Sequence, residues 1–546
     1  MYRRQTLFAE RAVPAPSVRR MSEMVNNGIS RRGALIALGA VGAAATVATD
    51  ASPAAAASSP LLLGKPESLG APPVEGLHLT FGTDPATRMV VSWTTHTAVR
   101  RPRVSYGSLD GGHGNIIEAE TRTYVDGVSG KTVYAHHATL GGLRPDTYYT
   151  YAALHDGGRP DAGTFQTAPR GRSAFTFTSF GDQSVPQVTW QPDGKGGYTP
   201  VMNANNTPAN ADIVSGIEQI NPLFHLLNGD LCYANLDPDR VRTWNSFFAN
   251  NTRSARYRAW MPAAGNHENE KNNGPLGFSA YQTYFKLPGN GDAAELQGLW
   301  YAFTAGSVRV ISLQNDDVAL QDGGDNYVSG YSGGGQRKWL ENELAKARAS
   351  QDIDWIVVCM HQVMVSSSDA NGADLGIRQN WGPLFDKYQV DLVVCGHEHD
   401  YERSLPVRGV VSGTETLTPR PAATDTSLVD SSAGTTHMVL GGGGVSGTTN
   451  GKFFPANKAK VITAVGAPPA GGGKRPSTYV FEETPWLASR DAEHPYGFAA
   501  FTVDPGTGPG ATTRMFVTYY NVTIPTGDIV PLESFTLHRR RSDRRR

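Results

Sequence analysis

The chain has 546 residues, more than one hydrophobic core usually organises, so its length indicates two or three domains. Hydrophobic residues make up 39 % and charged residues 18 %, as in an ordinary soluble globular protein. The formal net charge is −1 and no basic stripe runs through the body of the chain, which argues against a nucleic-acid partner.

Three cysteines, Cys232, Cys359 and Cys395, are too few for a disulfide framework. We expect buried thiols, with a Cys359–Cys395 bridge as the alternative.

Residues 1–57 have the pattern of an export signal. Arg31 and Arg32 precede an uncharged stretch rich in Ala, Gly, Leu and Val, which ends in the small residues Ala54–Ala57. Paired arginines before a mildly apolar core resemble a twin-arginine signal, so we expect cleavage near Ala57 and secretion. The alternative is a membrane-spanning helix, but the apolar stretch is short and weak for that role.

A β-sandwich is expected next. Residues 58–74 are rich in Ser, Pro, Gly and Leu and indicate a linker. The runs Leu77–Phe81 and Met89–Trp93 then predict strands. Residues Leu143–Tyr149 have the L-x-P-x-T-x-Y spacing that resembles the tyrosine corner of fibronectin type III-like sandwiches. We therefore expect an all-β sandwich over 75–170, serving as a spacer or support because it contains no catalytic cluster.

A different pattern begins at residue 171, where apolar runs recur and each ends in a polar motif. The runs are Phe175–Phe180, Phe224–Leu227, Ile356–Met360 and Leu392–Cys395. Continuous apolar runs predict strands buried on both faces, as in the central sheets of α/β layers. One face of residues 335–350 carries Trp339, Leu340, Leu344 and Ala347, which predicts a helix. We expect an α/β domain over 171–537, with a sheet core flanked by helices, and a basic disordered tail over 538–546.

Five short motifs follow these strands or lie close to them. They are Gly181-Asp182-Gln183, Gly229-Asp230-Leu231-Cys232-Tyr233, Gly265-Asn266-His267-Glu268, Met360-His361 and Gly396-His397-Glu398-His399. Each motif alone is weak evidence, since an Asp after a strand often caps a helix and a buried His is usually structural. Together they bring Asp, Tyr, Asn and His side chains to the strand ends, where α/β sheets bind ligands. A core gains nothing from so many polar groups, whereas a metal site requires them.

The five motifs resemble those of the metallophosphoesterase superfamily, and specifically those of the purple acid phosphatases. The run Gly396–Arg403, Gly-His-Glu-His-Asp-Tyr-Glu-Arg, matches that family closely. Tyr233 discriminates within the superfamily, because most members lack a metal-binding tyrosine at this position. A phenol ionises near about pH 10 in water, so binding as a phenolate at low pH requires a strongly charged cation such as Fe(III).

The resemblance implies a calcineurin-like fold, a dinuclear metal centre and acid phosphatase activity. The implied metal ligands are Asp182, Tyr233 and His399 for Fe(III), Asn266, His361 and His397 for a divalent ion (Zn, Mn or Fe), and Asp230 as the bridge between them. It also implies hydrolysis of phosphate monoesters by direct attack of a hydroxide held by the metals. His267 would then lie beside the phosphate and help to protonate the leaving group.

One position departs from the family pattern and keeps alternatives open. Family members often carry a further histidine shortly after His361, but residues 362–371 contain none. A second proton donor is therefore missing or replaced, by Asp369 or Asn371, which leaves a phosphodiesterase or nucleotidase on the same metals as the alternative. An inactive binding scaffold is disfavoured because all seven ligand positions are intact. A secreted phosphate-binding or wall-binding module, with the sandwich carrying the function, is a third alternative. The expected partner is a small phosphate ester, with no nucleic acid and no stable membrane span.

Overall fold

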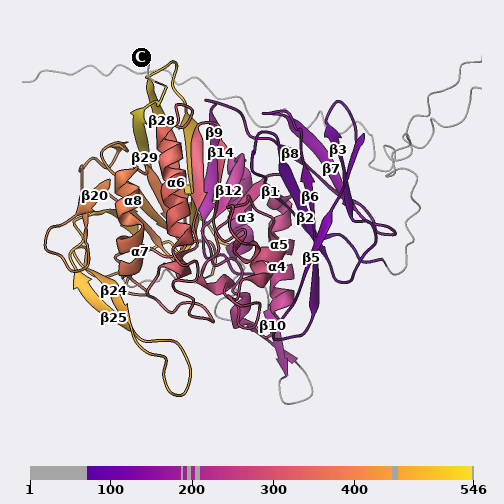
Figure 1. Cartoon of the computed structure of the whole chain (residues 1–546), viewed down its shortest axis with the longest axis horizontal. Helices are drawn as coiled ribbons and strands as arrows, with labels where there is room; N and C mark the ends of the chain where they lie inside the picture. Colours follow the sequence, from indigo (N-terminus) through magenta and orange to yellow (C-terminus); the bar gives the residue numbers. More distant parts are fainter. Residues whose placement is uncertain (1–70, 186–187, 193–197, 203–208, 446–452, 544–546) are drawn as a thin grey trace, which may run out of the picture. The chain divides into compact units, whose positions relative to one another are not determined.

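The computed structural model describes residues 71–185, 188–192, 198–202, 209–445 and 453–543. The expected export signal and residues 58–70 of the expected linker lie outside them. The described residues belong to one compact unit, 59–546 (Figure 1). No helix among them is long and apolar enough to cross a membrane.

The expected β-sandwich is formed by the N-terminal strands. These are β1 (Glu75–Phe81), β2 (Met89–Thr95), β3 (Arg103–Ser108), β4 (Asn115–Glu118), β5 (Glu120–Val125), β6 (Thr132–Leu140), β7 (Tyr148–Leu154) and β8 (Asp161–Gln166). One sheet has the order β1-β2-β6-β5 and the other β4-β3-β7-β8. The predicted tyrosine corner is confirmed, because the backbone N–H of Arg144 donates to the Tyr149 hydroxyl at 2.8 Å. Trp93, Tyr151 and Phe165 are buried between the two sheets.

Two central sheets form the rest of the core, as the apolar runs predicted. The first sheet contains the parallel strands β9 (Phe175–Phe180), β12 (Phe224–Leu227) and β13 (Ala259–Pro262), then β27 (Gly497–Asp504), β28 (Thr512–Val522), β29 (Ile529–Arg540) and β22 (Leu428–Asp430). The second has the order β14 (Tyr301–Ala305), β15 (Val308–Ser312), β16 (Trp355–Cys359), β18 (Leu392–Cys395), β23 (Thr436–Leu440), β19 (Tyr401–Ser404) and β26 (Leu487–Asp491). Every residue of β12 and β18 is buried. One apolar cluster joins the facing sides of both sheets, and the Tyr401 and Tyr519 rings stack across it at 3.9 Å.

Helices cover the outer faces of both central sheets (Figure 1). On the first sheet lie α3 (Ala209–Ile220), α4 (Arg240–Ala255) and α5 (Ser279–Tyr284), and on the second α6 (Gly335–Ala349), α7 (Leu375–Asn380) and α8 (Gly382–Lys387). The predicted helix corresponds to α6, whose Leu340, Leu344 and Ala347 are buried while Trp339 is half-buried. The remaining strands are β10 (Val188–Pro192), β11 (Tyr198–Met202), β17 (Ala373–Asp374), β20 (Val407–Val410), β21 (Pro419–Pro421), β24 (Ala459–Val465) and β25 (Ser477–Glu482). The described chain is therefore a β-sandwich followed by an α/β domain, as predicted.

The sandwich is joined to the α/β domain by a shared sheet. Strand β1 pairs with β13 in parallel at Leu79 and Ala259, so the sheet β1-β2-β6-β5 continues into the first central sheet. Thr80 donates from its hydroxyl to the carbonyl of Lys286 at 2.7 Å, across the same junction. Such backbone pairing fixes one domain against the other more firmly than a flexible linker does.

The prediction of a disordered tail from His538 is wrong for His538–Asp543. Strand β29 pairs with β28 as far as Arg540. The basic side chains find acidic partners, since Arg539 forms an ion pair with the buried Asp391 and Arg541 pairs with Asp543. A run of arginines thus becomes ordered where carboxylates of the fold face it, which composition alone does not reveal.

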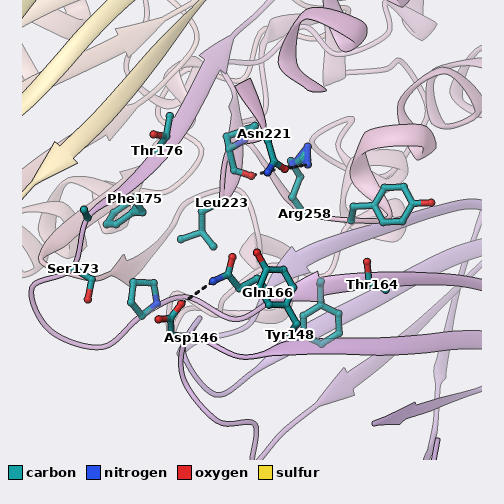
Figure 2. Close-up of a pocket in the computed structure, with 15 residues that line it drawn as sticks. Asp146, Tyr148, Thr164, Gln166, Ser173, Phe175, Thr176, Asn221, Leu223 and Arg258 are labelled. Atoms are coloured by element: carbon teal, nitrogen blue, oxygen red, sulfur yellow. Dashed lines mark hydrogen bonds between the residues drawn. The ribbon is translucent and has the colours of Figure 1, made fainter. Parts of the chain in front are cut away.

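A cavity of about 450 Å³ lies where β8 meets the beginnings of β9 and β12 (Figure 2). Its guanidinium, from Arg258, is already bound by Glu218, by Asn221 Oδ1 at 2.9 Å and by the Pro222 carbonyl at 3.1 Å. The five motifs follow the opposite, carboxyl ends of the strands. This cavity is therefore separate from the site described next.

Candidate metal centre

The five motifs meet at one edge of the two central sheets. Asp182 follows β9, Asp230 follows β12, Asn266 follows β13, His361 follows β16 and His397 follows β18. Strands β9, β12 and β13 are parallel, as are β16 and β18, so within each sheet these residues leave the same end. Because the two sheets face each other, the two sets of loops converge.

Four of the seven predicted ligands have left-handed backbone conformations. The φ angles are 61° at Asp182, 51° at Asp230, 57° at Tyr233 and 73° at His397. A non-glycine residue in this conformation costs roughly 1–2 kcal/mol in free energy of folding. Such strain persists only where the surrounding structure holds the backbone in place, and it is typical of functional sites.

The first donor group consists of Asp182, Tyr233 and His399. The Tyr233 hydroxyl donates to Asp182 Oδ1 at 3.1 Å and lies 3.1 Å from His399 Nε2. His399 Nε2 is also 3.5 Å from Asp182 Oδ1. Burial, and then the Asp182 and Asp230 carboxylates, raise the pKa of Tyr233 well above its usual value. This tyrosine can therefore bind as a phenolate only beside a cation.

The second donor group consists of Asn266, His361 and His397, with Asp230 beside them. His361 Nε2 lies 3.1 Å from Asn266 Oδ1, 3.1 Å from His397 Nδ1 and 3.0 Å from Asp230 Oδ2. The other imidazole nitrogen of each histidine is occupied. His361 Nδ1 donates to the Asn228 carbonyl at 2.7 Å, and His397 Nε2 donates to Gln321 Oε1 at 2.7 Å. The nitrogens that remain for a metal are thus His361 Nε2 and His397 Nδ1.

These contacts cannot all be hydrogen bonds. Lone pairs face His361 Nε2 from Asn266 Oδ1, the Asp230 carboxylate and His397 Nδ1. This nitrogen carries at most one proton, which can form a hydrogen bond to only one of the three. Burial opposes protonation of His361, but the Asp230 carboxylate raises its pKa to about 10. Among the described residues, the donor atoms of Asp230, His361 and His397 lie within 4.8 Å of one another. A cation could be bound by all of these lone pairs at once, so this set of residues fits a metal centre.

Glu268 is a site residue whose role the sequence did not reveal, although it stands in the third motif. Its Oε2 accepts the backbone N–H groups of Asp230 at 2.9 Å and Gly265 at 2.8 Å, and its Oε1 accepts that of Leu231 at 2.8 Å. The side chain is buried. Burial, with the Asp230 carboxylate, raises the pKa of Glu268 to about 8, and the N–H groups of Leu231 and Gly265 oppose that rise. Glu268 therefore ties the second motif to the third.

His267 and Asn371 were also predicted near the centre, and both lie beside it. His267 lies against Tyr233, with ring centroids 4.5 Å apart, and its Nδ1 donates to Asn235 Oδ1 at 2.8 Å. Asn371 donates to the His397 carbonyl at 3.2 Å and accepts from Gln321 at 3.1 Å. An amide engaged in this way supports the His397 loop and supplies no acidic proton.

All three cysteines are buried and free, so the alternative of a Cys359–Cys395 bridge is wrong.

Comparisons with known proteins show which family and fold this chain resembles. Residues 74–167 match the model of the purple acid phosphatase N-terminal domain, and residues 203–401 match that of the calcineurin-like phosphoesterases. The chain is 58 % identical to the uncharacterized protein Rv2577 of Mycobacterium tuberculosis, over 86 % of this chain and 88 % of that protein. It is 30 % identical to mouse acid phosphatase type 7, over 61 % of this chain and 71 % of the relative. A purple acid phosphatase from yellow lupin seeds has the same fold, with a TM-score of 0.60 and 22 % identity over 85 % of this chain and 74 % of that one.

The fold and the donor groups define a calcineurin-like phosphoesterase, a class that acts on phosphate esters. Within that class, the chain belongs to the purple acid phosphatase family. The family implies a dinuclear metal centre, which agrees with the two adjacent donor groups.

Proposed function

We propose that this protein is a secreted acid phosphatase that hydrolyses phosphate monoesters at a dinuclear metal centre. The observation that carries the proposal is the set of lone pairs that Asp230, Asn266 and His397 present to His361 Nε2. The group of Asp182, Tyr233 and His399 lies beside it, since Asp182 accepts the backbone N–H of His397. Asp182, Tyr233 and His399 would hold Fe(III), and Asn266, His361 and His397 a divalent ion, Zn, Mn or Fe, with Asp230 between them. When bound, the two cations would supply Lewis acidity for the phosphate oxygens and the attacking water.

The chain's own residues orient this centre through fixed hydrogen bonds. Asp182 Oδ2 accepts the backbone N–H of His397 at 2.8 Å, which leaves Oδ1 beside Tyr233 and His399. Asp230 Oδ1 accepts the backbone N–H of His267 at 2.9 Å, which leaves Oδ2 beside His361. Each carboxylate is thus held by one oxygen and presents the other, so little reorganisation is needed when charge develops.

His267 is the residue that would deliver a proton to the leaving group. Its Nδ1 is occupied by Asn235, and its Nε2 lies 3.9 Å from Asp230 Oδ2, on the side of the donor groups. The nitrogen able to exchange a proton with substrate is therefore Nε2. Because residues 362–371 supply no histidine, His267 would carry this role without the second donor common in the family.

The test is hydrolysis by the purified, metal-loaded protein of p-nitrophenyl phosphate and of bis-p-nitrophenyl phosphate. We expect the monoester to have the higher kcat/KM, with an optimum below neutral pH. We expect His267→Gln to lower kcat by about 10²-fold or more, as for loss of a general acid, and Asp230→Ala to abolish turnover. A preference for the diester would favour the phosphodiesterase alternative, and full activity in Asp230→Ala would refute the two-metal centre.

Export by the twin-arginine route is the remaining part of the proposal. It is supported by Arg31 and Arg32 before the uncharged stretch and by the small residues before Ala57. We expect the mature protein outside the cytoplasm, with a new N-terminus near Ala57. Replacing both arginines with lysine should retain the full-length chain inside the cell, which fractionation with N-terminal sequencing would show.

A further inference from the structure

The loop between β24 and β25, residues 466–476, reaches the loops around the metal centre. Figure 1 shows it extending beyond its two strands. The backbone N–H of Arg475 donates to Asp322 Oδ2 at 2.9 Å, and its guanidinium lies 4.7 Å from the Tyr327 ring centroid. Next to it, Lys474 Nζ donates to the Gly323 carbonyl. The end of this loop is thus fixed against the segment that also supplies Gln321 to His397.

Lys474 is linked to the second donor group through a single carbonyl group. The Gly323 carbonyl that accepts its ammonium also accepts Asn266 Nδ2 at 3.2 Å. The other amide atom of that asparagine, Oδ1, is the one 3.1 Å from His361 Nε2.

The charge of Lys474 is free to bind an anion. Within the part of the chain that the structure describes, its ammonium contacts no carboxylate and bonds to a neutral carbonyl. Arg475 differs, because its charge faces Asp322 at 3.9 Å. Lys474 is exposed, so a ligand can reach it from solvent. An anionic oxygen binds an ammonium more strongly than a carbonyl does, so a suitable ligand would displace the Gly323 contact.

We propose that Lys474 forms a subsite for a second anionic group of the substrate. The preferred substrates are then phosphate monoesters that carry a carboxylate or another phosphate close to the scissile phosphate. This inference rests on the proposed phosphatase function, because it assumes that the scissile phosphate binds at the donor groups. It names a substrate class that the metal ligands cannot define, since they contact the phosphate shared by every monoester.

The test separates binding from turnover by using phosphonates, whose P–C bond is not hydrolysed. Phosphonoacetate carries a carboxylate that ethylphosphonate lacks, and titration calorimetry with the metal-loaded protein gives Kd for each. We expect phosphonoacetate to bind more tightly, and Lys474→Met to reduce the ratio of the two Kd values about tenfold, equivalent to about 1.4 kcal/mol. Lys474→Arg should keep most of the preference, because it keeps the charge.

The matched control is Lys458→Met, beside the same hairpin. The Lys458 ammonium is exposed and lies 4.3 Å from the Phe481 ring centroid; among the described residues it forms no hydrogen bond or ion pair with the 320–326 segment or the donor groups. This variant should leave the ratio unchanged. A Lys474→Met ratio equal to that of the unaltered protein, or equal binding of both phosphonates before any substitution, would overturn the subsite.

Failure of the proposed function would be seen separately. Hydrolysis of glycerol 3-phosphate and 3-phosphoglycerate by the same preparations reports turnover. A protein that cleaves neither ester, yet shows the preference that depends on Lys474, would refute the phosphatase and retain the subsite. A protein that cleaves both esters without any such preference would do the reverse.

Discussion

Glu268→Gln is the substitution that tests most directly how the metal-centre loops are held. The Glu268 carboxyl accepts three backbone N–H groups, from Asp230 and Gly265 on Oε2 and from Leu231 on Oε1. Glutamine with its oxygen at the Oε2 position keeps two of these bonds but places an NH₂ group against the Leu231 N–H. A buried N–H without an acceptor costs roughly 1–3 kcal/mol. Because the pKa of Glu268 is raised to about 8, loss of its negative charge adds to this cost only above that pH.

We therefore expect Glu268→Gln to lower the free energy of unfolding by about 1–3 kcal/mol at pH 7. Metal affinity should fall by roughly 10–100-fold, because the residue orients a ligand-bearing loop. Urea unfolding and metal content after dialysis measure the two effects. The control is Glu270→Gln, since Glu270 is equally buried but accepts from Trp244 Nε1 at 2.7 Å and from Asn273. It should lose stability and keep its metals. Unchanged stability and full metal content in Glu268→Gln would refute the reasoning.

Three further predictions concern a buried ion pair, acid stability and colour. Arg378 and Glu482 form a buried bidentate pair at 2.8 Å, so Arg378→Met should cost about 3–5 kcal/mol in urea unfolding, and adding Glu482→Leu should recover most of it. Burial, with Arg378, lowers the pKa of His437 to about 3. Between about pH 6.5 and about pH 3 His437 is protonated in the unfolded chain and neutral in the folded chain. The free energy of unfolding should therefore decrease as the pH is lowered, by about 2.5 kcal/mol at pH 4.5. His437→Phe should weaken this slope, and an identical slope would contradict the assignment. If Tyr233 binds Fe(III), Tyr233→Phe should remove the visible charge-transfer band while dialysed metal content stays measurable, and a persisting band would exclude the tyrosine as its source.

Much of the site was predictable from the sequence because its signals are local. Residue type and position after an apolar run are enough to place Asp182, Asp230, His361 and His397 at strand ends, whereas no run was identified before Asn266. Parallel strands then bring those ends to the same edge of their sheet. The tyrosine corner was equally local, since Arg144 and Tyr149 are five residues apart.

Other features depended on which distant segments the fold places side by side. Gln321 reaches His397 and Lys474 reaches Gly323 from loops far away in the sequence, and no spacing rule connects them. The strand at His538–Arg540 was missed because its order comes from pairing with β28 and from carboxylates such as Asp391.

The sequence by itself determined the chemistry of the centre, because the residue types that can bind metals and the strands that present them are written in short segments. The tertiary structure alone decided which atom of each predicted ligand faces the candidate centre. Asn228 and Gln321 occupy one nitrogen of His361 and of His397, and Glu268 fixes the loop of Asp230. These partners are chosen by loop packing between two facing sheets, which exists only once the chain has folded.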